Sequence, residues 1–211
     1  MNDLRPRWFV RNLESALKVL PVTVVTGARQ TGKTTLVKSL NPVRAYFTLD
    51  DVGVLDQAER HPDTLLGSRP VTLDEVQRTP PLLLAVKRAV DERRRAGDFL
   101  LTGSANLLLM GQVADTLAGR AIYLELPPFC PAEWQQRKGA LSPLDRLFET
   151  DFDFREWPTE TGDWPTWLLR GGYPPALTIA ANSDRALWFS AYRSDLPGAR
   201  SASIERRVQP P

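Results

Sequence analysis

The sequence is poor in several residue types, and each scarcity excludes a class of protein. Cys130 is the one cysteine and His61 the one histidine among 211 residues. An internal disulfide is therefore excluded, and a zinc site built from these residue types is not indicated. No apolar run reaches the roughly 18 residues of a membrane span, and the start of the chain lacks the apolar stretch of a signal peptide. The net charge of +2 does not indicate nucleic acid as a partner. We expect a cytoplasmic protein with no membrane segment.

The overall composition is that of a folded globular protein. Apolar residues make up 42% of the chain and charged residues 25%, so wholesale disorder is not expected. A length of 211 residues is enough for one well-buried α/β domain with a small appendage.

Five short apolar runs read as β-strands, and most of them are separated by stretches of helical periodicity. The runs are Val22–Thr26, Ala45–Leu49, Val71–Leu73, Phe99–Leu101 and Ala121–Leu126. Helices are expected from Trp8 to Leu20, from the end of residues 27–34 to Leu40, from Thr79 to Gly97, and over Leu107–Leu117. This alternation predicts an α/β fold with a parallel five-stranded sheet covered on both faces. Residues 1–126 form the expected core, and the proline- and tryptophan-rich residues 127–192 a smaller helical or irregular lid region.

The loop after the first expected strand, residues 27–34, fits the pattern G-x-x-x-x-G-K-[ST] in full. Such a loop surrounds a phosphate chain with inward-pointing backbone N–H groups, and its glycines allow close approach. Lys33 is expected to reach the β- and γ-phosphates, and the Thr34 hydroxyl to bind Mg²⁺. The expected ATP-binding residues are Gly27, Ala28, Arg29, Gln30, Thr31, Gly32, Lys33, Thr34 and Thr35.

Two acids follow the third expected strand. At the end of a parallel strand beside a phosphate-binding loop, Asp74 is placed to hold Mg²⁺ through water. Glu75 is placed to polarise the attacking water as a general base. The alternative is a solvated pair of acids at the start of a loop, which becomes the weaker interpretation once the phosphate loop is present.

Two further candidates have close structural alternatives. The small polar residues Thr102, Ser104 and Asn106 follow the fourth strand and could orient the lytic water, or Ser104 could merely cap a helix. Arg120 precedes the last strand and could be a surface ion-pair partner or a finger that reaches a nucleotide. From its residue type alone the surface role is favoured.

The order of these strings resembles the prokaryotic AAA+-type ATPases in which an ATPase core precedes a C-terminal domain of unknown function. The strings are the phosphate loop, LDD at 49–51, LDEVQR at 73–78, LTGSAN at 101–106, LAGR at 117–120 and RGGYP at 170–174, and the resemblance covers about residues 5–192. It implies Walker A residues Lys33 and Thr34, Walker B residues Asp74 and Glu75, and a sensor near Ser104. It also implies a sheet order of 5-1-4-3-2, an arginine finger at Arg120 that serves a neighbouring subunit, and Arg170 in the lid.

The chain departs from this pattern after Tyr192. Members of the family continue with a string like Thr-Tyr-Leu-Glu-Arg-Asp and a further domain, whereas here residues 193–211 are rich in Arg, Ser and Pro. A set of codons that encodes residues 193–207 in one reading frame encodes a string close to the family's in a shifted frame. We therefore expect residues 193–211 to be an irregular, frameshift-derived tail, with a genuine short variant as the alternative. Sequencing the gene distinguishes the two.

Three functions remain open at this point. The first is Mg²⁺-dependent ATP hydrolysis coupled to a conformational or assembly change in the protein itself or an unknown protein partner. The second is a small-molecule kinase, against which Asp74-Glu75 argues because this pair suits water as the nucleophile. The third is a truncated module that binds ATP with poor turnover.

Overall fold

The computed structural model describes residues 5–104, 116–136 and 164–196. It divides into two compact units, residues 1–129 and residues 130–211.

The first unit is built on a parallel sheet of five strands. The strands are β1 (Val22–Thr26), β2 (Ala45–Thr48), β3 (Val71–Asp74), β4 (Phe99–Thr102) and β5 (Ala121–Glu125). Their spatial order is β2-β3-β4-β1-β5, which is the predicted order 5-1-4-3-2 and confirms the predicted fold class. Every residue of β1, β3 and β4 is buried, which is why these strands are rich in apolar and β-branched residues without the polar alternation of a half-exposed strand.

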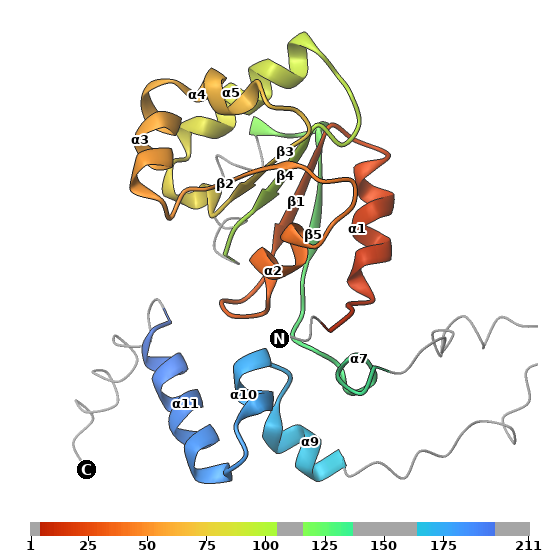
Figure 1. Ribbon diagram of the computed structural model, residues 1–211, viewed down its shortest axis with the longest axis vertical. Helices are drawn as coiled ribbons and strands as arrows, with labels where there is room; N and C mark the ends of the chain where they lie inside the picture. Colours follow the sequence, from red (N-terminus) through yellow and green to blue (C-terminus); the bar gives the residue numbers. More distant parts are fainter. Residues whose placement is uncertain (1–4, 105–115, 137–163, 197–211) are drawn as a thin grey trace, which may run out of the picture. The chain divides into compact units, whose positions relative to one another are not determined.

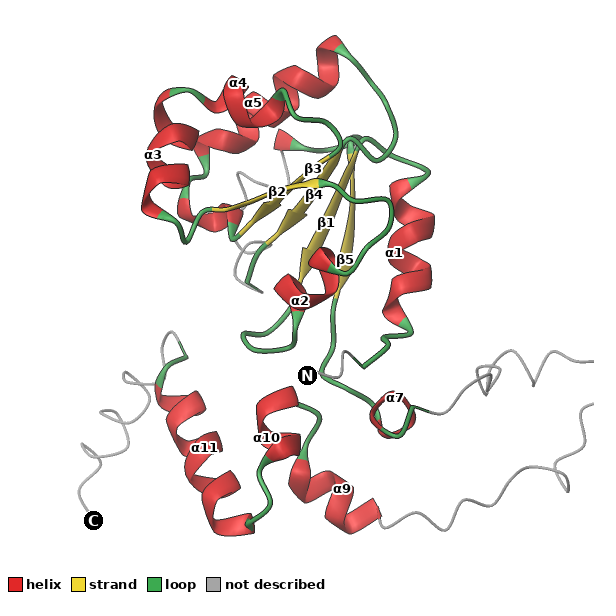
Figure 2. Cartoon of the chain, viewed as in Figure 1, coloured by secondary structure: helices red, strands yellow, loops and turns green. Residues whose placement is uncertain are grey.

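Helices cover both faces of this sheet (Figure 1). On one face, α3 (Val52–Arg60), α4 (Pro62–Leu66) and α5 (Pro81–Glu92) pack on a core that includes Leu73 and Phe99. On the other face, α1 (Phe9–Leu17) and α2 (Lys33–Lys38) pack on a core that includes Val25 and Leu100. Figure 2 shows the strands running toward the end of the sheet at which α2 begins.

Two features of the first unit differ from the sequence prediction. Helices α3 and α4 were not predicted, although Asp51 is a standard N-cap whose carboxylate accepts from the N–H groups of Gly53 and Val54. Helix α5 ends at Glu92 and not near Gly97, because Arg93 is extended. Gly97 lies where the chain turns back against α1, and a Cβ there would lie 2.6 Å from the carbonyl oxygen of Leu17.

The turn after α5 holds a buried carboxylate. The Asp98 side chain is 3% exposed and forms ion pairs with Arg93 at 3.1 Å, Arg69 at 3.7 Å and Arg95 at 4.0 Å. Because Arg69 is itself largely buried and the other two arginines are exposed, the Arg69 pair is the least screened by solvent.

We expect Asp98→Asn to lower the free energy of unfolding by about 2 kcal/mol, since it removes the charge that these guanidinium groups share. Urea denaturation measures the change. Asp56→Asn is the matched control, because Asp56 pairs with Arg60 on the exposed surface of α3, and its loss should cost less than about 0.5 kcal/mol. Equal losses in the two variants would show that burial of Asp98 contributes nothing.

The second unit contains short helices. These are α7 (Pro131–Trp134), α9 (Trp164–Arg170), α10 (Pro174–Thr178) and α11 (Asn182–Ser194). The buried Arg185 of α11 donates to the carbonyl oxygens of Ala176 and Ile179, and so fastens α11 to α10. Within the same unit, Tyr173 packs edge-on against Phe189.

Several sequence predictions fall outside the described residues. Most of the helix expected over Leu107–Leu117, the candidate Asn106, and residues 197–211 of the expected tail belong to this group. Of the helices in the described ranges, none has the combination of length and apolarity that crossing a lipid bilayer demands.

Candidate nucleotide site

The predicted phosphate loop lies between β1 and α2, at the carboxyl end of the sheet. Its first glycine, Gly27, has φ 139° and lies so close to β5 that a Cβ would be 2.5 Å from the carbonyl oxygen of Leu126. Its second glycine, Gly32, is the left-handed N-cap of α2 with φ 96°. Both positions therefore require glycine, and the loop is held in a conformation that presents the first turn of α2.

Lys33 is the buried cation of this loop. Its ammonium group donates to the carbonyl oxygens of Gly27 at 3.0 Å and Ala28 at 2.9 Å, and the residue is 6% exposed. Burial lowers the pKa of Lys33, while the nearby carboxylates of Glu75 and Asp74 act to raise it. The positive charge is thus held inside the loop. Within the part of the chain that the structure describes, Lys33 forms no direct ion pair with Asp74 or Glu75.

Asp74 lies at the end of β3 and is 2% exposed. Its Oδ2 accepts hydrogen bonds from the hydroxyl of Thr34 at 2.8 Å and of Tyr46 at 2.6 Å, and its Oδ1 accepts from the hydroxyl of Thr102. Burial, followed by the hydrogen bond to Asp74, raises the pKa of Tyr46, so the phenol keeps its proton at neutral pH and is the donor in this hydrogen bond. Three hydroxyl donors from three different elements therefore fix one carboxylate.

The residues around Asp74 fit a magnesium ion. Mg²⁺ prefers oxygen ligands and is usually held by one or two carboxylates together with substrate phosphates. The Thr34 hydroxyl and the Asp74 carboxylate are oxygen donors already within 2.8 Å of each other, and they adjoin the loop built for phosphate.

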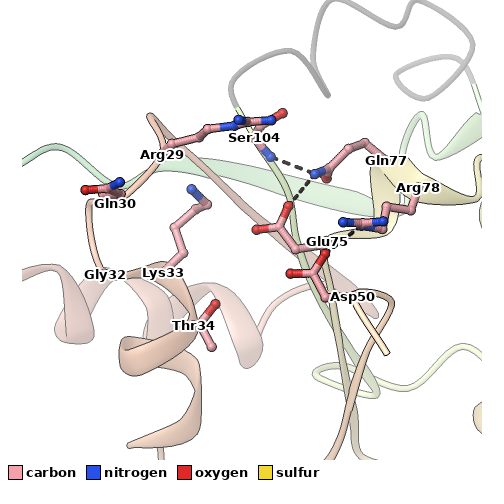
Figure 3. Close-up of a pocket in the computed structure, with 10 residues that line it drawn as sticks. All are labelled: Arg29, Gln30, Gly32, Lys33, Thr34, Asp50, Glu75, Gln77, Arg78 and Ser104. Carbon is pink, nitrogen blue, oxygen red and sulfur yellow. Dashed lines mark hydrogen bonds and ion pairs between the residues drawn. The ribbon is translucent and has the colours of Figure 1, made fainter. Parts of the chain in front are cut away.

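Glu75 has a strained backbone. Its φ of 62° is in the left-handed region, where a residue with a side chain costs about 1–3 kcal/mol. Its N–H donates to the Thr102 hydroxyl at 3.2 Å, and its carboxylate accepts from the side-chain amide of Gln77. The amide oxygen of Gln77 in turn accepts from the N–H of Ser104 at 3.4 Å. As Figure 3 shows, the two contacts of Gln77 join Glu75 to Ser104, at the start of the loop that follows β4.

Most of these groups line one cavity of about 590 Å³, and Asp74 lies behind the lining, bonded to Thr34. Its lining residues are Arg29, Gln30, Gly32, Lys33, Thr34, Asp50, Glu75, Gln77, Arg78 and Ser104. In Figure 3 the side chains of Lys33 and Glu75 extend toward the same space from the phosphate loop and from the end of β3. The structure therefore brings together most of the predicted binding residues with Glu75 and Ser104. Thr35 is exposed on α2 and is not among the lining residues.

The cavity also contains residues to which the sequence analysis assigned no role. Asp50 follows β2 and forms an ion pair with Arg78 at 2.6 Å, and Gln77 holds Glu75. Asp50, Gln77 and Arg78 all belong to strings that follow strands, so their position at the carboxyl edge of the sheet was the available signal.

Arg7 also supports the phosphate loop, and the sequence analysis assigned it no role. It is 8% exposed and donates to the carbonyl oxygen of Thr31, in the phosphate loop, at 3.1 Å. It also donates to the carbonyl oxygen of Pro127 at 2.6 Å and lies over the ring of Phe129. Arg7 thereby joins the phosphate loop to the chain that leaves β5. An arginine outside any expected element gave no signal for this role.

Arg120 is not part of this cavity. It immediately precedes β5, whose first residue Ala121 pairs with Val22 at the start of β1. Arg120 therefore lies at the amino end of the sheet, whereas the phosphate loop is at the carboxyl end. Its guanidinium binds Asp91 of α5 through two hydrogen bonds of 2.7 Å and 3.0 Å. This pairing raises the pKa of Arg120 and lowers that of Asp91.

Comparison with known proteins identifies the family. The model of a family described as AAA domain matches residues 20–135, which include the whole sheet and both the phosphate loop and Asp74-Glu75. The chain belongs to this family of AAA+-type P-loop ATPases. The membership confirms the family predicted from the motif order.

Two curated proteins are similar to this chain, with the same identity and coverage. They are the uncharacterized proteins Rv2008c of Mycobacterium tuberculosis and Mb2031c of Mycobacterium bovis, each 33% identical over 184 residues. The match covers 85% of this chain but 36% of each relative, so the AAA-family chain described here spans little more than a third of their length.

Two solved structures superpose on this chain at low sequence identity. A Walker-type ATPase of Pyrococcus abyssi superposes with a TM-score of 0.52 at 15% identity, over 98% of this chain and 77% of its own. DnaA of Aquifex aeolicus, solved with AMPPCP bound, gives a TM-score of 0.49 at 16% identity, over 95% of this chain and 65% of its own. The first of these likenesses supports the P-loop ATPase fold.

Proposed function

We propose that this AAA-family protein binds ATP with Mg²⁺ and hydrolyses it in the cytoplasm, and that hydrolysis drives a conformational or assembly change. The observation that carries the proposal is the convergence of Lys33, Thr34 and Glu75 on one cavity at the carboxyl end of the sheet, with Asp74 bonded to the Thr34 hydroxyl behind it. A cation, a pair of metal-binding oxygens and a carboxylate that can accept a proton are the groups that phosphoryl transfer to water requires.

Each group has a separate task. Lys33 binds the β- and γ-phosphates, and the backbone N–H groups at the start of α2 surround them. Thr34 and Asp74 hold Mg²⁺, which neutralises the charge that develops on the phosphate oxygens. Glu75 accepts a proton from the attacking water. Its contact with Gln77 holds the carboxylate at the cavity while the backbone of Glu75 stays bound to Thr102.

An ADP-release assay, run with and without candidate acceptor molecules, tests the proposal. Release of ADP and phosphate with Mg²⁺ and water alone is the expected result. Transfer to an acceptor would indicate a kinase, and nucleotide binding without release would indicate the binding-only module. Recovery of proteins from cells with an ATP-trapped Glu75→Gln variant identifies the partner on which the ATPase acts.

We further propose that Arg120 serves the nucleotide of a neighbouring subunit in a homo-oligomer. Its position at the amino end of β5, remote from the phosphate loop in the parallel register, supports action between chains over action within one chain. In the single chain its charge is directed at Asp91, a half-exposed partner that a neighbour's phosphates could replace.

Turnover per subunit is therefore expected to rise with protein concentration, and Arg120→Ala is expected to lower turnover more than nucleotide affinity. Steady-state hydrolysis over a range of protein concentrations, combined with light scattering, measures both effects. Arg94→Ala is the control, since it removes an exposed arginine of the same region whose guanidinium donates to a backbone carbonyl, that of Gly119. Turnover that stays constant in a strict monomer would contradict the proposal.

A further inference from the structure

Tyr46 contacts Asp74, the carboxylate proposed to hold Mg²⁺, although Tyr46 belongs to none of the sequence motifs of the site. It lies on the edge strand β2, where its register partner on β3 is Thr72, while Asp74 pairs with Thr48. Tyr46 and Asp74 are thus diagonal neighbours across two strands, and side chains at this spacing lie on one face of the sheet. A tyrosine is long enough to span such a diagonal, and its hydroxyl reaches Asp74 Oδ2 at 2.6 Å.

The ring of Tyr46 is held in place as well as its hydroxyl. It packs against the core formed with α1 and α2, and the ammonium group of Lys38 lies 4.3 Å from the ring centroid. Lys38 is the last residue of α2, whose first turn carries Lys33 and Thr34. The phenol is therefore fixed between the helix that follows the phosphate loop and the strand that carries Asp74.

The Tyr46 bond differs in kind from the other bond to the same oxygen. Thr34 also donates to Asp74 Oδ2, at 2.8 Å, but Thr34 is itself an expected metal ligand and belongs to the nucleotide-binding loop. Tyr46 belongs to β2 and, with Lys38 and Thr72, lines a second pocket that is distinct from the nucleotide cavity. Its bond to Asp74 therefore does not depend on contacts with the nucleotide.

We infer that Tyr46 is a positioning residue for the metal site: its hydroxyl fixes the orientation of the Asp74 carboxylate and so sets the affinity for Mg²⁺. Partners that orient metal-binding carboxylates commonly change metal affinity by about 10- to 100-fold when removed. The inference rests on the proposed function, because it assigns Asp74 to the metal. It adds a residue of β2 to the site.

The test is a magnesium titration followed by a fluorescent ADP analogue. Tyr46→Phe removes the hydroxyl and keeps the ring, so the packing against α2 is retained. In EDTA, the variant should bind the analogue as the wild type does. It should need about tenfold more Mg²⁺ to reach half of the magnesium-dependent gain in affinity.

Tyr123→Phe is the matched control. Tyr123 is a half-buried tyrosine on β5 that packs against the core on the opposite face of the sheet. Its variant should reproduce the wild-type magnesium midpoint.

Three results would overturn the inference. One is an unchanged magnesium midpoint in Tyr46→Phe. Another is an equal loss of affinity with and without Mg²⁺, which would make the hydroxyl a structural group only. The third is a wild type that binds the analogue with no magnesium-dependent gain. Failure of the proposed function looks different, since then the wild type would bind no nucleotide or would release no ADP.

Discussion

Glu75→Gln is expected to bind ATP as tightly as the wild type and to lose roughly 100- to 10,000-fold in turnover, the range associated with a positioned general base. The substitution keeps the shape of the side chain, and its amide oxygen can still accept from the amide of Gln77. The left-handed backbone at Glu75 and its N–H bond to Thr102 do not involve the carboxylate and should persist. Only the capacity to take a proton from water is lost.

Fluorescent-nucleotide titration and single-turnover phosphate release measure the two quantities separately. Glu59→Gln is the control, because Glu59 is exposed on α3 and is not among the residues that line the cavity. Comparable losses of binding and turnover in Glu75→Gln would refute a role confined to the chemical step.

The fold was predictable from the sequence because its signals are local and strong. Buried parallel strands such as β1 and β4 appear as runs rich in apolar and β-branched residues, and the glycines at 27 and 32 occupy positions that tolerate little else. Helices α3 and α4 were missed because they are short, nine and five residues, and only the Asp51 cap and Pro62 mark their starts. Tertiary packing on the core, through Ala58 and Leu65, determines that they form.

The residues of the candidate site were predictable from the sequence only where they lie in a contiguous motif. Lys33, Thr34, Asp74 and Glu75 follow strands and form recognisable strings, whereas Tyr46, Gln77 and Arg7 act through contacts that join distant parts of the chain. A cross-strand diagonal such as Tyr46 to Asp74 depends on strand register, which only the assembled sheet determines. The predicted role of Arg120 has the same limitation, since its test requires a second chain.

Lys33→Ala is expected to weaken ATP binding by about 100-fold or more, because charge-assisted contacts to phosphate are among the strongest hydrogen bonds in proteins. A hundredfold loss corresponds to about 2.7 kcal/mol. The structure indicates why no neighbour can substitute. Lys33 is buried beneath the loop with its ammonium group between the carbonyls of Gly27 and Ala28, whereas Arg29 is exposed at the rim. Removing the lysine leaves the anionic phosphates near Asp74 and Glu75 without the buried cation that offsets both acids.

The loss should also differ between nucleotides. If Lys33 contacts the β- and γ-phosphates, Lys33→Ala should reduce affinity for ATP and ADP far more than for AMP, which isothermal titration calorimetry measures directly. Lys87→Ala removes a lysine from α5, remote from the cavity lining, and should leave all three affinities unchanged. Thermal denaturation of the nucleotide-free proteins separates a binding defect from a folding defect, because Lys33 also donates to two loop carbonyls in the absence of ligand. An Lys33→Ala protein that melts like the wild type and binds ATP with unchanged affinity would remove Lys33, and with it the phosphate-binding loop, from the proposed function.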